Sequence, residues 1–171
     1  MLTITDRFDG PGPASAELVL PFELRQRSRL RARLASGEEV ALLLPRGTVL
    51  RGGDRLRGDD GRVVTVVAEP EPVYRVECHT AEELARCAYH LGNRHTAVQI
   101  IGARDGHYAL RILADPVFKE MLEGLHAHVT AERAPFEPEA GAYGGGHHHG
   151  DHAHAPRIHR AGEAPAHHHH D

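Results

Sequence analysis

The first part of the chain alternates hydrophobic and polar positions over short runs. The runs are rich in aliphatic residues, are separated by glycine, proline and aspartate turns, and cover residues 2–5, 17–20, 29–34, 38–44 and 62–68. Short strands at this spacing are typical of small β-sandwiches and barrels. We therefore predict a small all-β domain over residues 1–73, which ends at the stiff, polar segment 69–72.

From residue 73 onward the pattern changes to helices that alternate with strands. A strand is predicted over 73–78, and the helix after it begins at Thr80 in a capping box with Glu83 and stops near Gly92. The later elements are two strands, a helix that opens with Asp115 and Pro116, and a last strand: 96–101, 108–113, 115–123 and 126–134. The order β-α-β-β-α-β is that of ferredoxin-like folds. We predict such a domain over residues 74–143, and an α+β fold class for the chain.

Residues 144–171 have the composition of a tail. Three glycines open it, ten of the sixteen histidines of the chain lie in it, and Ile158 is its one large aliphatic residue. So little apolar surface cannot offset the entropy lost on ordering. We therefore predict a His-rich tail that is disordered without a ligand.

Charge and targeting signals favour neither nucleic acid nor membrane as a partner. The net charge is −4 with histidine counted neutral, and residues 1–73 balance eleven arginines against eleven acidic residues. The N-terminus has no basic stretch followed by an apolar one, and the longest apolar run, residues 40–44, is far too short to span a bilayer. We expect a cytoplasmic protein, with Cys78 and Cys87 as small buried residues.

The tail carries the strongest chemical signal. Many imidazoles lie on a backbone of glycine, alanine and aspartate, beginning with His147, His148, His149, His152 and His154. Neutral imidazole binds nickel, copper and zinc, and a pliable array of it suits carriage or storage better than catalysis. An expression tag could explain His167–His170, but not the irregular earlier set. Copper would bind such ligands more tightly than nickel, so metal choice depends on availability.

His95 is the second candidate ligand, at the turn that follows the first predicted helix. A lone histidine there is by base rate a surface or packing residue. A polar Gly-Asn-Arg exit before it allows its imidazole to project outward. Two copies that face each other across a twofold axis would make a shared metal site. His90 is interpreted as a structural residue or a support for the ligand.

An alternating row of five arginines, Arg25 to Arg33, would point to one face if the segment is a strand. Such a row is either a solvated face that protects a sheet edge or a docking surface for an acidic partner. Signatures of enzymes are missing from the sequence: it contains no Walker A loop, HExxH, GxSxG or dinucleotide fingerprint. We therefore do not expect an enzyme.

A set of recognisable stretches runs in order along nearly the whole chain: residues 29–33, 37–40, 44–47, 53–54, 89–95 (YHLGNRH), 99–100, 115–122, 135–143 (PFEPEAGAY) and the His-rich tail. Together they resemble the UreE family, the urease accessory nickel metallochaperones. The resemblance implies an N-terminal domain similar to a peptide-binding domain of chaperones. It also implies a ferredoxin-like C-terminal domain that forms homodimers.

The resemblance implies a function as well. Nickel would bind His95 of both protomers, supplemented by histidines of the tails, and pass to the urease GTPase UreG and then to apo-urease. Some family members have a further histidine pair before the second helix, where this chain reads Leu113-Ala-Asp-Pro116, so no auxiliary site is expected there. Zinc or copper could also bind in vitro. The alternative function is a His-rich store for nickel, copper or zinc without a dedicated client.

Overall fold

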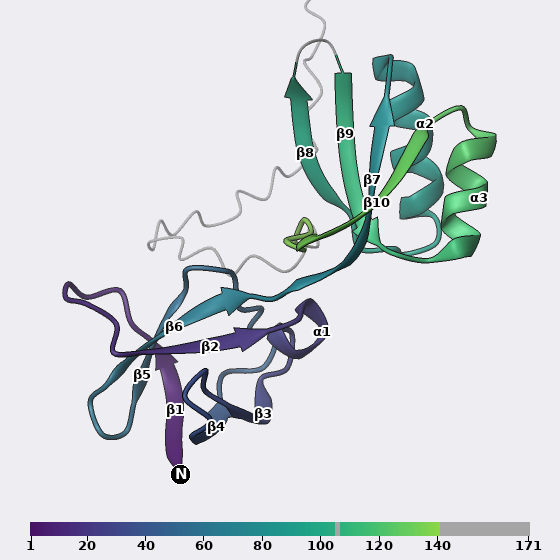
Figure 1. The fold of residues 1–171 in the computed structure, drawn as a ribbon. Coiled ribbons are helices and arrows are strands. Elements are labelled where there is room, and N and C mark those ends of the chain that lie inside the picture. Colours follow the sequence, from purple (N-terminus) through teal and green to yellow (C-terminus); the bar gives the residue numbers. More distant parts are fainter. Residues whose placement is uncertain (105–106, 141–171) are drawn as a thin grey trace, which may run out of the picture.

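The computed structural model describes residues 1–104 and 107–140. These residues form two sheets, one of six strands and one of four, that share no strand (Figure 1). Residues 141–171 lie outside the described part, and with them the predicted tail and its candidate ligands His147, His148, His149, His152 and His154. No helix in the described part is long and apolar enough to cross a membrane.

The first domain is a twisted six-stranded sheet. Its strands are β1 (Leu2–Arg7), β2 (Ala16–Leu20), β3 (Arg29–Arg33), β4 (Glu39–Leu43), β5 (Arg55–Gly58) and β6 (Val63–Ala68), with a short helix α1 (Phe22–Arg25) between β2 and β3. The strand order is β2-β6-β5-β1-β4-β3. Alternate side chains such as Ile4, Leu42 and Val64 are fully buried in one aliphatic core, and each contributes about 1.5–3 kcal/mol.

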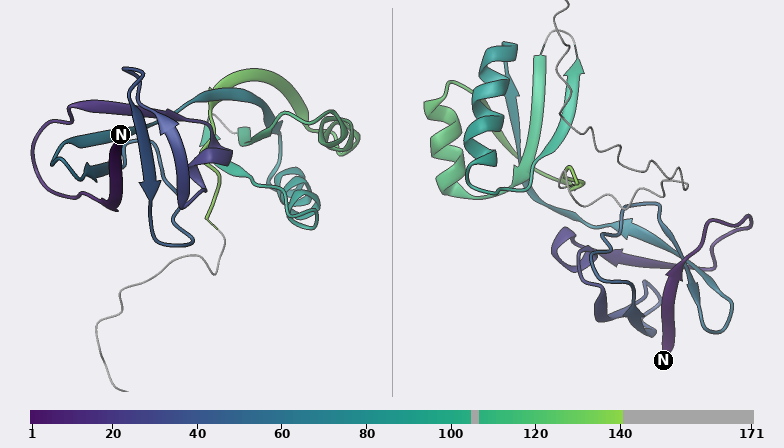
Figure 2. Two further views of the ribbon diagram at one scale, coloured as in Figure 1. Left: turned by 90° about the horizontal axis from the view of Figure 1, so that it is seen from below. Right: turned by 180° about the vertical axis from the view of Figure 1, so that it is seen from behind.

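The second domain is a four-stranded antiparallel sheet with two helices on one face (Figure 2). Its elements are β7 (Pro70–Cys78), α2 (Ala81–Gly92), β8 (Gln99–Arg104), β9 (His107–Leu113), α3 (Pro116–Gly124) and β10 (His128–Pro135). The sheet order is β10-β7-β9-β8. Leu91 of α2 and Leu122 of α3 pack on Val76 and Ile112 of the sheet. The succession of helices and strands is the predicted one.

Both helices begin at the predicted caps. The Thr80 hydroxyl accepts a hydrogen bond from Glu83 N at 3.1 Å, and the Asp115 carboxylate accepts from Val117 N at 2.8 Å. Glu83 departs from the predicted box, because its carboxylate accepts from the backbone N–H of His79 at 2.8 Å. Each cap satisfies amide groups that have no partner within the helix.

Four elements differ from the sequence prediction by more than two residues, and one of them is β8, which lies three residues later than the predicted strand over 96–101. β5 and α1 were not predicted, because β5 buries only one large side chain, Leu56, and α1 is a single turn. β7 begins three residues before the predicted Val73, and pairs along β10 from Pro70. A hydrogen bond from Ala114 N to Pro72 O shows that Pro72 turns its backbone away from β10, so its missing N–H interrupts no bond to that strand.

The condition for a row of five arginines on one face holds for three of them. Only Arg29, Arg31 and Arg33 lie in a strand. The backbone N–H groups of Leu24 and Arg25 both donate to Pro21 O at 3.1 Å, and this turn carries the Arg25 side chain into the interior, where it is 0% exposed. Arg27 follows the turn and pairs with Glu23 at 2.7 Å.

Buried Arg25 binds the segment of residues 136–139, which we call the strap. Its guanidinium donates to Leu20 O, Leu50 O and Phe136 O, and lies 3.0 Å from the Glu137 carboxylate. Removing one partner of a buried charge pair costs about 3–5 kcal/mol, because the other charge stays behind without compensation. The strap is therefore fixed to the first domain.

Further contacts join the strap to both domains. Glu137 accepts from Arg51 at 3.2 Å and from Gly52 N at 2.8 Å, and the Phe136 ring meets Phe22 edge-on at 5.3 Å. On the other side, Glu139 N donates to Val98 O at 2.8 Å. The strap thus connects the first domain with the turn region that follows α2.

Candidate metal-binding site

His95 occupies a special backbone position at the end of α2. Its φ is +53°, in the left-handed region that L residues other than glycine and asparagine seldom adopt. Thr96 N donates to Leu91 O at 3.2 Å and His95 N donates to Gly92 O at 2.9 Å, the two bonds of a Schellman motif. The motif turns the chain sharply, and the His95 side chain is exposed.

The neighbourhood of His95 is an exposed face of small and apolar residues. Ala85, Ala88 and Gly92 line the outer side of α2 and are exposed, Tyr89 is 65% exposed, and Ile100 of β8 is 57% exposed. A groove of about 300 Å³ continues this face, lined by Leu84, Ala88, Gly92, Thr96, Val98, Ile100, Leu110 and Glu139. Exposed apolar surface of this kind is typical of an interaction site.

The hydroxyl of Thr96 adds one polar atom to this groove. Thr96 Oγ1 is buried and has no hydrogen-bond partner within the described residues. Such an atom is unusual in a folded protein. It lies on the residue that directly follows His95.

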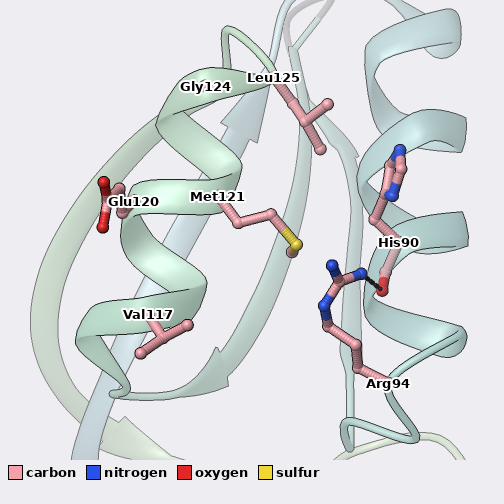
Figure 3. Close-up of a pocket in the computed structure, with 7 residues that line it drawn as sticks. All are labelled: His90, Arg94, Val117, Glu120, Met121, Gly124 and Leu125. Carbon is pink, nitrogen blue, oxygen red and sulfur yellow. Dashed lines mark hydrogen bonds between the residues drawn. The ribbon is translucent and has the colours of Figure 1, made fainter.

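His90 lies in a second groove, of about 480 Å³, between α2 and α3. Figure 3 shows the Met121 thioether pointing from α3 into this gap, while the Glu120 carboxylate points away from it. Arg94 donates to the His90 carbonyl oxygen at 3.0 Å and not to its ring, whose closest aromatic contact is Tyr89, edge-on at 5.3 Å. No second histidine lines this groove, and Glu120, the one acidic residue in its lining, turns its carboxylate away from His90.

The two thiols are buried beneath α2. Cys78 and Cys87 are both 0% exposed, with their sulfur atoms 3.9 Å apart. Burial raises the pKa of the Cys78 thiol to about 12 and also raises the pKa of Cys87. Both therefore stay protonated and act as the small core residues that we predicted, since the thiolate is the form that binds metal.

The described residues do not complete a metal site by themselves. Across residues 1–104 and 107–140, no three His, Cys, Asp or Glu side chains are grouped to hold an ion. His95 lies on an exposed turn, and the predicted ligands of the tail lie outside the described part. A site at His95 therefore needs ligands from residues 141–171 or from a second copy.

The strap lies beside this turn. Glu139 N donates to Val98 O, and Glu139 lines the same groove as Gly92 and Thr96, the neighbours of His95. Sequence reasoning did not assign a role to Glu139 or Tyr89, although both lie in motifs that it singled out. His126, at the end of α3, has the same left-handed conformation, with φ +70°.

Comparison with known proteins places these features in one family. The family model described as "UreE urease accessory protein, N-terminal domain" matches residues 4–69, and its C-terminal counterpart matches residues 71–171. The urease accessory protein UreE of Nitrosospira multiformis is 53% identical, with 97% of this chain and 99% of the relative covered.

Two further relatives bear the same name. UreE of a Janthinobacterium species is 54% identical over 84% of this chain and 82% of its own length, and UreE of Pseudomonas fluorescens is 49% identical over 95% and 98%. The chain therefore belongs to the UreE family of urease accessory proteins, which are metallochaperones with a role in urease maturation and not enzymes.

Proposed function

We propose that the chain is a cytoplasmic nickel metallochaperone that binds Ni(II) at a homodimer interface and delivers it to the urease GTPase UreG and apo-urease. The observation that carries the proposal is the exposed, left-handed His95 beside an apolar face of α2. We propose that residues 1–73 dock a partner, and that a ferredoxin-like domain over residues 74–143 binds the metal and forms the dimer. Residues 144–171 supply additional ligands. The sheet order β10-β7-β9-β8 supports a domain of that type.

The dimer part of the proposal rests on the surroundings of His95. A single imidazole holds a metal weakly, whereas a twofold axis beside His95 would bring two imidazoles together without any further change in the chain. Ala85, Ala88 and Gly92 are small, so two copies of α2 could approach closely, and Tyr89 would lose its large exposed surface. This face supports an interface in which His95 of one protomer lies near His95 of its partner.

The tail part of the proposal rests on chain length. His147 is seven residues beyond Ala140, the last residue described, and an extended chain spans about 3.3–3.6 Å per residue. The first histidines of the tail can therefore reach about 25 Å from the strap, which ends beside the His95 turn. His147, His148, His149, His152 and His154 are the ligands that we propose to join His95.

Ligand exchange follows from this ligand set. Imidazoles on a turn and a tail can be replaced one at a time, so the ion passes to a partner without being free in water. Imidazole also binds Zn(II) and Cu(II), and copper more tightly than nickel, so the choice of nickel in the cell depends on metal availability. No nucleic acid or membrane enters this proposal.

The test follows the metal. Protein loaded with nickel is mixed with the urease GTPase and its nucleotide, the two are separated, and nickel is measured in each. We expect nickel to move to the GTPase, and urease activation to fall in cells that lack this gene at limiting nickel. Nickel that remains on this protein, together with normal urease activation, would overturn the proposal in favour of metal storage without a client.

A further inference from the structure

The outer face of β3 carries three arginines. β3 pairs with β4 in the register Arg29↔Leu43, Arg31↔Ala41 and Arg33↔Glu39. The alternation of the strand puts all three arginines on the exposed face and turns Leu30 and Ala32 toward the core. β3 is the last strand of the sheet, so this row forms its border.

Two of these three positive charges are not neutralised. Arg33 pairs with Glu39 at 2.7 Å across the strands, and Arg27, just before β3, pairs with Glu23 at 2.7 Å. Neither Arg29 nor Arg31 has a carboxylate within 4 Å in the part of the chain that the structure describes. Among the described residues, Arg29 and Arg31 thus form a patch of two guanidinium groups without a carboxylate partner, on a domain whose charges balance as a whole.

A groove of about 430 Å³ runs beside these arginines and is lined by Met1, Thr3, Arg29, Leu30, Arg31, Ala41, Leu42 and Leu43. Thr3, Ala41 and Arg31, three of these residues, are neighbours across β1, β4 and β3, and Ala41 is buried between the other two. The small Ala41 between two longer side chains makes the hollow. Leu43, 50% exposed, adds an apolar surface at one end. The groove thus has a positively charged wall and an apolar floor.

The backbone at this border is also open. Leu44 N donates to Ser28 O and Leu34 N donates to Glu38 O. Because hydrogen-bonded pairs alternate in an antiparallel ladder, Leu30 and Ala32 turn their backbone groups to β4, and Arg29 and Arg31 turn theirs outward. β2 approaches only beyond the end of β3, where Ala35 N donates to Glu17 O. Arg29 and Arg31 can therefore pair with a further extended chain.

We propose that this surface binds an extended acidic segment of a partner protein. Arg29 and Arg31 are two residues apart, or about 7 Å along a strand, the spacing of alternate side chains in any extended chain. The best ligand therefore has carboxylates at alternate positions, which pair with the two guanidinium groups. Main-chain bonds along a strand edge give affinity, and the alternate side chains give specificity.

The surface lies apart from the proposed metal site. The N-terminus, whose Met1 lines the groove, is at the end of the first domain farthest from the second domain (Figure 1). The inference extends the proposed function, in which residues 1–73 dock a partner. Because the binding needs no nickel, it is tested on the metal-free protein, and its failure would leave nickel binding and transfer untouched.

The probe is a fluorescein-labelled peptide of alternating aspartate and leucine, compared by fluorescence anisotropy with its asparagine counterpart. We expect the aspartate peptide to bind the full-length chain, and to bind more weakly as salt is added, since salt screens exposed charges. The double variant Arg29→Glu/Arg31→Glu should lower the affinity for the aspartate peptide about tenfold or more, because two exposed ion pairs are replaced by repulsion between like charges. Equal binding of the aspartate and asparagine peptides, or no binding of the former, would overturn the inference.

Two further variants keep the test specific. The control is the double variant Arg27→Glu/Arg46→Glu, which changes the net charge of the first domain as much as Arg29→Glu/Arg31→Glu does. Both of its residues are exposed and lie outside β3. If the effect is local, its affinity for the aspartate peptide should stay within about twofold of that of the unchanged protein. Leu43→Asp places a negative charge directly across the strands from Arg29 and should weaken binding of the aspartate peptide about as much as the loss of one arginine. A control variant as damaging as the double variant, or a neutral Leu43→Asp, would contradict binding at this groove.

Discussion

The two helices of the second domain end in the same way but in different surroundings. His95 after α2 and His126 after α3 are both left-handed, and each lies at the same place in a Schellman motif. Thr96 N reaches Leu91 O at 3.2 Å, and Ala127 N reaches Leu122 O at 3.1 Å. The backbone therefore does not distinguish the two histidines.

Their neighbours do distinguish them. His95 adjoins the exposed face of α2, an apolar groove and the strap from which the tail continues. His126 leads through buried Ala127 into β10, and Leu125 before it lines the groove that also holds Glu120 and Arg94. The comparison teaches that the surroundings of an exposed histidine decide whether it is a candidate metal ligand. Beside His95 these are an apolar surface suited to a second copy of the chain and the strap, after which the His-rich residues follow in the sequence.

The largest expected difference between the two ends is in metal binding. His95→Ala should remove the tightest bound nickel of each dimer, because both imidazoles of the proposed shared site are lost, while the fold is kept, since an exposed side chain contributes little packing. His126→Ala, the matched control, should bind nickel as the unchanged protein does. Calorimetric titration measures both. Tight binding that survives His95→Ala, or is lost in His126→Ala, would break the comparison.

The second expected effect concerns the tail. Deletion after Gly146 removes all ten histidines of residues 147–171 and should lower the number of nickel ions bound more than it lowers affinity at His95. Tail ligands are numerous but lose conformational entropy when they bind, whereas the turn is already ordered. Equilibrium dialysis gives the stoichiometry. Equal stoichiometry in the full-length and shortened proteins would contradict this reading.

The third expected effect is on pH dependence. Free imidazole takes up a proton near pH 6.5, and a site that needs two imidazoles should lose roughly ten- to a hundredfold in nickel affinity per pH unit below about pH 6. No gain is expected between neutral pH and pH 9, because the raised pKa of Cys78, about 12, and of Cys87 keeps both thiols protonated. The profile of His126→Ala should match that of the unchanged protein. A rise in affinity above pH 8 that vanishes in Cys87→Ala would instead implicate the thiols.

The smallest expected effect is on stability and should be the same at both ends. A left-handed backbone conformation strains histidine but not glycine, and glycine has the larger conformational entropy in the unfolded chain. The first effect exceeds the second, so His95→Gly and His126→Gly should each raise the free energy of unfolding by about 0.5–1 kcal/mol. Urea unfolding measures this gain. A gain at His126 with a loss at His95 would mean that the His95 side chain has a stabilising contact of its own in the free protein.

Local signals in the sequence were enough for the order of helices and strands in the second domain. Thr80 and Asp115 mark helix starts because a cap depends only on residues two or three positions away. Long-range contacts were not visible. Arg25 is buried because Phe136, 111 residues later in the chain, accepts its hydrogen bond, and no alternation rule contains that information.

The candidate site likewise has features that local sequence signals reveal and features that depend on long-range contacts. The imidazole of His95 could be singled out from its polar turn, and the tail from its composition. The left-handed backbone of His95 could not be foreseen, since glycine is the usual residue there and Gly92 stands three positions earlier. The apolar groove beside it needs Ile100, Leu110 and Glu139 from three separate segments, so only the folded chain brings it together.

The pairing of β7 with β10 has a mechanical consequence. The register runs without interruption from His128↔Glu77 to Pro135↔Pro70, so the two strands extend from the second domain as one two-stranded ribbon. Where the ribbon ends, Arg25 and Arg51 form ion pairs with Glu137 of the strap. A ribbon held at both ends resists twisting, and amide relaxation of residues 1–140 should fit a single rotational diffusion tensor. A torque applied to the first domain is then transmitted through the strap to Ala140, the point from which the remaining residues depart.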